Sequence, residues 1–217
     1  MNYLFLSKTE LFRGMSENEI KHLTECLGAY EKSYSESDII YMAGDTVCDI
    51  GLVLHGSVNI VVNYYWGGSN IFGHISAGQV FAETYAVIPG NELLCDVVAA
   101  EDSTILFINA DKMLNLCQNA CGFHNRLIQN LLKISAQKNL NLSVRMTHTA
   151  SRFIRDRLLS YFSEQALLSG TSQFSIPFSR QQLADYLGVE RSALSNELSK
   201  MKRDGLIDYS KNSFKLL

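Results

Sequence analysis

Residues 177–198, PFSRQQLADYLGVERSALSNEL, constrain the fold most, because they predict two short helices joined by a glycine turn. Ser179 can cap the first helix, and the side chain of Gln182 can bond back to the amide of that cap. Gly188 tolerates the positive φ of the turn, and Ala184 is small enough for a second helix to cross closely. The stretch is therefore predicted to be a helix-turn-helix.

The second predicted helix runs from about Arg191 to Arg203 and has one apolar and one polar face. Its apolar residues continue a buried seam from the first helix: Leu183, Leu187, Leu194 and Leu198. Its polar residues turn outward at helical spacing: Arg191, Ser192, Ser195, Asn196 and Lys200. Such a face can enter a major groove, and the start of the first helix adds three candidate DNA contacts, Ser179, Arg180 and Gln181.

A predicted β-hairpin follows the two helices directly. Residues 206–210 and 213–216 alternate like strands, and Lys211 and Asn212 between them form a tight turn. A helix-turn-helix followed by a hairpin is a winged helix-turn-helix. The alternative is a helical hairpin that mediates protein contacts rather than DNA binding.

The charge of the chain is divided between its two parts. Residues 1–120 hold 5 Lys and Arg against 15 Asp and Glu, a net charge of −10, whereas residues 121–217 hold 14 against 7, a net charge of +7. A basic part that contains the predicted helix-turn-helix is typical of a nucleic-acid-binding module, and the acidic part would then be a separate sensing module. The alternative is a chance asymmetry of solvated faces.

The acidic part predicts one or two short helices over residues 10–29 and then many short strands. Ser16 and Glu19 form a second capping box. The predicted strands are 38–41, 50–54, 58–62, 71–75, 94–99 and 104–108. Short strands at near-regular spacing favour a compact β-barrel or roll, so the fold class is α+β.

A long helix is predicted over residues 121–147, since residues 123–147 contain neither proline nor glycine. Its apolar stripe of Leu127, Leu131 and Ile134 predicts a dimer interface with a second copy of the chain. The alternative, a helix packed on its own β-domain, is nearly as well supported. A further helix is expected from Ala150 to about Leu168 and ends at Gly170.

These elements predict three parts: a β-roll sensing domain over 1–120, a dimerisation helix over 121–147 and a winged helix-turn-helix over 148–217. The first residues lack the basic segment and the apolar run of a signal peptide, so a cytoplasmic location is expected. Residues 50–82 carry no charged residue, but Gly, Asn, Ser and His interrupt them, which favours strands over a membrane span. No membrane partner is expected.

The cysteine and histidine residues do not form a recognisable metal or catalytic motif. Five cysteines are scattered along the chain, and His22 with Cys26, or Cys117 with Cys121, would supply only two ligands each. No nucleophile is paired with a base and an orienting group, so the chain is not expected to be an enzyme. The sequence identifies neither a metal site nor a cofactor.

The whole arrangement resembles the CRP/FNR superfamily of bacterial transcription regulators. The resemblance is carried by Ala43-Gly44-Asp45, by residues 53–58 and 78–83, and by the helix-turn-helix. It implies a jelly-roll sensor domain, a homodimer on a palindromic double-stranded DNA operator, and RNA polymerase as a partner. It also directs attention to His74 and His124, because haem-binding members take axial ligands from this region; a structural role is expected for both.

In members that bind cyclic nucleotides, the segment that matches residues 78–86 is a phosphate-binding cassette. The resemblance therefore implies an effector site made of Phe81, Ala82, Glu83, Thr84, Tyr85, Leu94 and Cys95. Glu83 matches the Glu that binds the ribose, but Leu93, Leu94 and Cys95 stand where those members have an Arg for the cyclic phosphate. A buried phosphate without a paired charge is costly. A small effector other than cyclic AMP, or no effector, is expected.

The predicted reading helix also departs from the best-known members. They carry Arg-Glu-x-x-x-Arg, whereas this chain has Arg191-Ser192-x-x-x-Asn196. Arg191 suits a guanine edge or a phosphate and Asn196 an adenine edge, but the Glu that would accept from cytosine is missing. A different operator sequence is expected.

Overall fold

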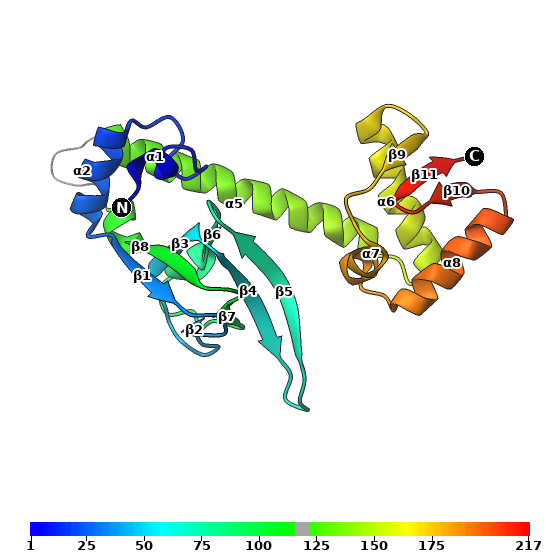
Figure 1. Ribbon diagram of the computed structural model, residues 1–217, viewed down its shortest axis with the longest axis horizontal. Helices are drawn as coiled ribbons and strands as arrows, with labels where there is room; N and C mark the ends of the chain where they lie inside the picture. The colour runs from blue at the N-terminus through cyan, green and yellow to red at the C-terminus, as the bar shows by residue number, and fades with distance from the viewer. Residues whose placement is uncertain (116–121) are drawn as a thin grey trace. The chain divides into compact units, whose positions relative to one another are not determined.

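The computed structural model describes residues 1–115 and 122–217, which form two compact units (Figure 1). The amino-terminal unit comprises Met1–Ala136 and the carboxy-terminal unit Gln137–Leu217. One long helix, α5 (Gly122–Thr149), contributes its first half to one unit and its second half to the other. The predicted division into 1–120, 121–147 and 148–217 stays a prediction. The paired Cys117 and Cys121 lie outside the described residues.

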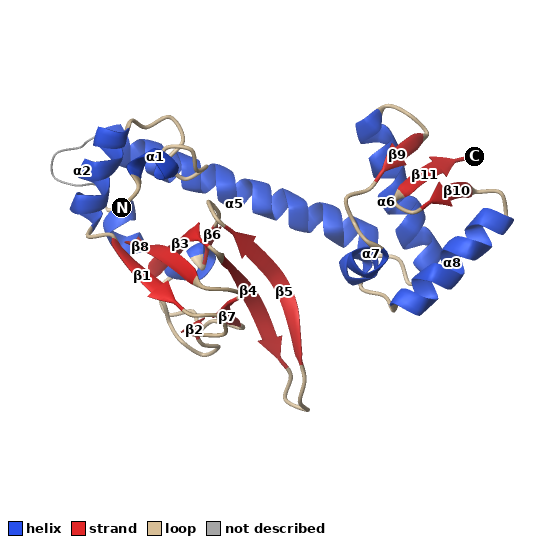
Figure 2. Cartoon of the chain, viewed as in Figure 1, coloured by secondary structure: helices blue, strands red, loops and turns tan. Residues whose placement is uncertain are grey.

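The amino-terminal unit contains two antiparallel four-stranded sheets (Figure 2). One sheet has the order β1-β8-β3-β6, with bounds Tyr30–Tyr34, Ser103–Asn109, Asp49–His55 and Val80–Phe81. The other has the order β2-β7-β4-β5, with bounds Ile39–Tyr41, Asp96–Ala99, Ser57–Asn63 and Ser69–Ser76. The six predicted strands are present, and β1 and β6 are additional. The predicted α+β class and β-roll are therefore confirmed.

Residues from both sheets share one hydrophobic core. The core contains Val53, Ile105 and Phe107 from one sheet and Val58, Val97 and Ala99 from the other. Successive side chains of a strand point to opposite faces of the sheet, so β3 and β8 turn Val53, Ile105 and Phe107 into this core and Leu52, Leu106 and Ile108 to the other face, where they are buried in a second core. The uncharged residues 50–82 are strands and turns of this roll. No helix in the described part of the chain is long and apolar enough to cross a membrane.

Short helices cover the roll: α1 (Tyr3–Leu6), α2 (Glu17–Leu27), α3 (Glu83–Ala86) and α4 (Ala110–Leu114). The predicted capping box is confirmed, because Ser16 accepts from the amide of Glu19 and Glu19 accepts from the amide of Ser16. Leu23 and Leu27 of α2 pack with Leu106 and Ile108 of β8 in a second core.

The first half of α5 corrects the predicted dimer interface. Leu127 is fully buried and Leu131 is 6% exposed, both in the core that α1 and α2 form with the roll, and Ile134 packs against the same core. Between them, Asn130 donates to the carbonyls of Leu11 and Arg13 at 3.0 and 2.9 Å. The apolar stripe therefore packs against its own chain, because α1 and α2 supply an apolar surface for this face of α5. This is the alternative that the sequence left open.

The carboxy-terminal unit has the order α6 (Ile154–Ser169), β9 (Gln173–Ser175), α7 (Arg180–Leu187), α8 (Arg191–Arg203), β10 (Ile207–Ser210) and β11 (Ser213–Leu216). The helix-turn-helix is confirmed, with the Ser179 and Gln182 capping box and with Gly188 at φ 64°. The three strands form one antiparallel sheet, β10-β11-β9, so the wing is confirmed. Strand β9 was not predicted, because only Phe174 of its three residues is buried.

The helix expected from Ala150 begins later, at Ile154. Phe153 is extended, with φ −92° and ψ 136°, and its amide donates to the hydroxyl of Ser151 at 3.2 Å. This local bond replaces a helical one and therefore separates α5 from α6. The end at Gly170 is confirmed, because this residue has φ 67° and closes the helix.

Candidate DNA-reading surface and effector cassette

The outward face of α8 is held by three fully buried residues, Leu194, Leu198 and Met201, which pack against α6 and α7. Of the predicted contacts on this helix, Arg191, Ser192, Asn196 and Lys200 are exposed. Ser195 is half-buried, and its hydroxyl donates to the carbonyl of Arg191 at 2.9 Å. The exposed face of α8 therefore presents Arg191 and Asn196, two side chains suited to hydrogen bonds with base edges, while its opposite face is buried.

An ion-pair network connects α8 to α6. Nε of Arg155 on α6 lies 2.6 Å from Oε1 of Glu197, and its Nη2 lies 2.8 Å from Asp204 at the end of α8. These bonds raise the pKa of Arg155. The other oxygen of Glu197 lies 3.8 Å from Nζ of Lys200, so this lysine is partly neutralised by its own helix.

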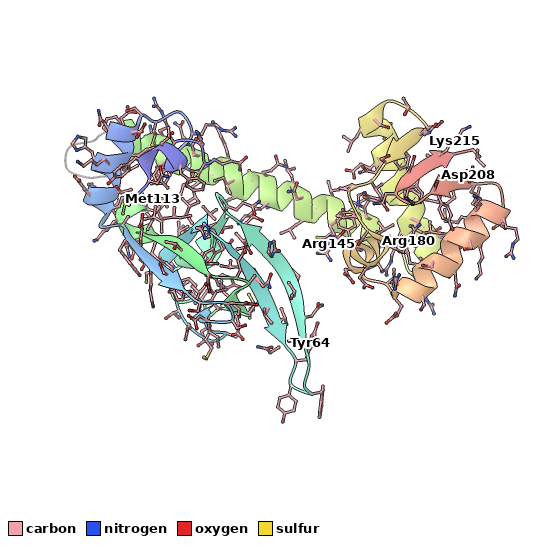
Figure 3. All side chains as sticks on the ribbon, viewed as in Figure 1. Tyr64, Met113, Arg145, Arg180, Asp208 and Lys215 are labelled. Carbon is pink, nitrogen blue, oxygen red and sulfur yellow. The ribbon has the colours of Figure 1, made fainter. Side chains whose placement is uncertain are left out.

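The three candidate DNA contacts at the start of α7 each contact other groups of the same unit. The Ser179 hydroxyl caps the helix, and Gln181 donates to the carboxylate of Asp185 at 2.8 Å. The guanidinium of Arg180, a residue labelled in Figure 3, lies 5.3 and 5.6 Å from the ring centroids of Tyr209 and Phe214. Burial lowers the pKa of Arg180. Arg180 thus joins α7 to the wing, and its role as a DNA contact stays a prediction.

The wing offers basic residues that the sequence prediction did not include. Lys211 is exposed in the hairpin turn at φ 53°. Lys215, which is labelled in Figure 3, is exposed on β11. By contrast, Nζ of Lys202 lies 2.6 Å from the carboxylate of Asp208, so its charge is satisfied within the unit. The Lys-Asn pair in a tight turn was the available sequence signal for this surface.

The predicted effector cassette forms the short helix α3. Its preceding residue, Ala82, has a left-handed backbone with φ 60°, and Glu83 is 6% exposed. Thr84 is exposed and its hydroxyl lies 3.5 Å from Oε1 of Glu83, while Tyr85 is half-buried. The short helix that the resemblance implied is present, and the effector-binding role of its residues stays a prediction.

Two of the predicted effector residues differ sharply in exposure. Phe81 is 2% exposed and packs edge-on against Tyr41 in the core of the roll, with ring centroids 6.2 Å apart. Leu94 is 80% exposed, whereas its neighbour Leu93 is 3% exposed. The role of both residues in an effector site stays a prediction. Cys95 is half-buried, and burial, followed by the nearby charge of Asp96, raises the pKa of its thiol.

The described residues provide no group of three or more His, Cys, Asp or Glu side chains that could hold a metal ion. Nδ1 of His74 lies 2.8 Å from the Asn59 side chain, and His124 is 1% exposed, with its pKa lowered by burial. A groove of about 540 Å³ is lined by Tyr30, Tyr41 and residues 44–49. It does not include the predicted effector residues.

Comparison with known families divides the chain in the same way. Residues 31–120 match the cyclic nucleotide-binding domain family, and residues 156–217 match the Crp-like helix-turn-helix domain family. A transcriptional activator protein, FnrL of Cereibacter sphaeroides, is 23% identical over 185 residues, which cover 82% of this chain and 72% of that protein.

Solved structures of low identity share the fold. The catabolite activator protein of Thermus thermophilus has a TM-score of 0.53 at 18% identity and covers 96% of this chain and 94% of its own. CprK complexed with OCPA has a TM-score of 0.66 at 13% identity and covers 91% and 88%. The c-di-GMP responsive regulator CLP of Xanthomonas campestris has a TM-score of 0.56 at 17% identity and covers 93% and 99%.

The sensor-like roll, the winged helix-turn-helix and the two family matches occur in one order along one chain. The chain therefore belongs to the CRP/FNR superfamily, whose members are transcription regulators and not enzymes.

Proposed function

We propose that this protein regulates transcription by binding a palindromic operator as a homodimer, with α8 in the major groove. One observation carries the proposal: Arg191, Ser192 and Asn196 are exposed together on a helix whose other face is fully buried. Arg and Asn are the side chains that most often read guanine and adenine edges. The basic wing residues Lys211 and Lys215 are suited to the flanking phosphates.

We assign the dimer contact to a different face of α5 from the one the sequence suggested. Residues 128, 132, 135, 139, 142 and 146 follow the alternating spacing of four and three that is typical of a coiled coil. Leu132 is 67% exposed, Leu142 53% and Met146 71%, so this face carries large apolar side chains that the chain itself does not cover. Asn139 in the middle would fix the register of two parallel helices.

A two-fold symmetric dimer requires half-sites about one helical turn, roughly 34 Å, apart. Binding-site selection from random duplexes, followed by fluorescence titration at several salt concentrations, tests this. We expect a motif with dyad symmetry and an affinity that falls steeply with salt, because neutralised phosphates release counterions. Salt-insensitive binding without sequence preference would instead favour a module for protein contacts.

We further propose that the roll responds to a small effector other than cyclic AMP. Leu93 is buried and Leu94 exposed where an Arg would pair with the cyclic phosphate, so the described cassette offers no guanidinium at that position. One protein of similar fold, CprK, binds OCPA and another, CLP, responds to c-di-GMP, which supports an effector other than cyclic AMP in this fold. Calorimetry should find cyclic AMP binding no tighter than about millimolar. Micromolar binding would refute this.

RNA polymerase is the protein partner that family membership supports, and the cytoplasm is the corresponding location. Transcription from a promoter with the selected operator, reconstituted with purified polymerase, would test the partner. A change in transcript level on addition of the protein is expected. An unchanged level with the operator occupied would argue against a regulatory contact.

A further inference from the structure

The end of α5 contacts the end of α7, the first helix of the helix-turn-helix. Nε of Arg145, a residue labelled in Figure 3, donates to the carbonyl of Tyr186 at 3.0 Å, and its Nη2 donates to the carbonyl of Asp185 at 3.1 Å. The same guanidinium lies over the Tyr186 ring, 5.6 Å from its centroid. The last carbonyls of a helix have no partner within the helix, so Arg145 supplies donors that α7 lacks.

A buried histidine one turn further along α5 contacts the same tyrosine. His148 is 3% exposed, and its Nδ1 lies 2.8 Å from the hydroxyl oxygen of Tyr186. Its Nε2 lies 3.3 Å from the carboxylate of Glu164 on α6, and the ring of Tyr161 packs edge-on against it at 5.4 Å. Both ring nitrogens are therefore engaged, one with α6 and one with α7. Tyr186 is held at its backbone by Arg145 and at its hydroxyl by His148.

A second arginine completes the contact from α6. Nη1 of Arg157 donates to the carbonyls of Leu187 and Gly188 at 2.8 and 3.3 Å, and its Nε donates to the carbonyl of Ser151 at 2.7 Å. Ser151 lies in the connection between α5 and α6. The four carbonyls from Asp185 to Gly188 are thus bound by two arginines, and the turn that leads to α8 is tied to this connection.

Helices α7 and α8 pack in one core, because Leu183 and Ala184 of α7 and Leu194 of α8 are fully buried in it. We propose that Arg145 and His148 are positioning residues for DNA recognition, which act through Tyr186 to set the orientation of α8 relative to the end of α5. The proposal rests on the proposed DNA-binding function. We call the contact of Arg145 and His148 with Tyr186 the joint. If two α5 helices pair in the dimer, this joint sets the orientation of the two reading helices relative to their half-sites.

The test compares two DNA duplexes, one with the full palindrome and one with a single half-site. Tyr186→Phe removes only the hydroxyl that contacts His148, and Arg145→Gln removes the fork that binds Asp185 and Tyr186. A half-site needs only an intact reading helix, whereas the palindrome needs two helices in the correct relative orientation. We expect each variant to lose about five- to tenfold in affinity for the palindrome, because the loss of one hydrogen bond changes a dissociation constant by about that much. The affinity for the half-site should fall by less than about twofold.

Tyr161→Phe is the matched control, because it removes a hydroxyl from the same aromatic cluster and leaves the contact between His148 and Tyr186 intact. It should change neither affinity. Arg145→Lys keeps the charge without the fork and should lose less on the palindrome than Arg145→Gln.

Equal losses on both duplexes would overturn the proposal, because they would indicate a smaller folded fraction rather than a changed orientation. Unchanged affinity for the palindrome would overturn it as well. If the unaltered protein bound neither duplex in a salt-dependent way, the DNA-binding function itself would fail, and this result is distinguishable from a failure of the joint alone.

Discussion

The ring of Phe81 lies directly against the backbone of Gly51, so that a Cβ atom at position 51 would overlap three atoms of the ring. Both residues lie in paired strands, with Gly51 of β3 opposite Phe81 of β6. The glycine is required for space here, because the buried ring has no free volume to move into.

Gly51→Ala should therefore destabilise the amino-terminal unit by about 1–3 kcal/mol, the usual cost of overpacking a core. Urea unfolding followed by circular dichroism measures this; Trp66 is 91% exposed and its fluorescence would not report on the core. Gly73→Ala is the control: its Cβ would meet Ile60 at an ordinary 3.6 Å and should cost much less. Phe81→Leu in the Gly51→Ala background should restore part of the loss, and a variant as stable as the parent would contradict the packing described.

Replacing Arg191 or Asn196 with Ala should cost about 1–3 kcal/mol for the selected operator and relax preference at one base pair each. Lys200→Ala should instead weaken binding to all sequences alike and reduce the salt slope by about one unit, because lysines further along such a helix more often meet phosphates. Fluorescence titration against operator variants measures both. Unchanged sequence preference in Arg191→Ala would mean that another face of α8 reads the bases.

Leu132→Glu should give monomers of otherwise normal stability, because Leu132 is 67% exposed in the single chain. Sedimentation equilibrium at micromolar concentration measures the mass. Leu131→Glu is the matched comparison one residue away: this side chain is 6% exposed, so the change should destabilise the amino-terminal unit by about 3 kcal/mol or more. A dimer that survives Leu132→Glu would place the interface elsewhere.

Acidification should destabilise the carboxy-terminal unit through His148. Burial lowers the pKa of this imidazole, with a smaller opposing effect of Glu164, so the folded state binds a proton less readily than the unfolded state. In the unfolded chain the pKa of His148 has its ordinary value of about 6.5, so the unfolded state is protonated first as the pH falls. The free energy of unfolding therefore decreases between this pH and the lower pKa of the folded state. Urea unfolding by circular dichroism at pH 7.5 and 5.5 measures the loss.

His148→Gln provides the control for this pH dependence, because it removes the titrating group and leaves the other histidines unchanged. The stability difference between the parent protein and His148→Gln should shrink as the pH falls. A difference that is constant between pH 7.5 and 5.5 would show that the folded protein does not disfavour protonation of His148.

Local chemistry allowed much of this protein to be predicted from its sequence. The capping box of Ser179 and Gln182, the positive φ of Gly188 and the bounds of α8 depend on residues within one or two turns of each other. The turn at Lys211 and Asn212 is equally local. For this reason the helix-turn-helix, the wing and most strands of the roll were correctly predicted.

Only the tertiary structure determined which surface packs against each face of a helix. The spacing of Leu127 and Leu131 was compatible with a second chain or with the chain's own core, and the distant α1 and α2 settled it. Arg180 lies over aromatic rings because β10 and β11 fold back onto α7. The contact of Arg145 with Tyr186 joins residues 41 positions apart. Periodicity identifies a face of a helix, but only long-range packing determines which surface covers that face.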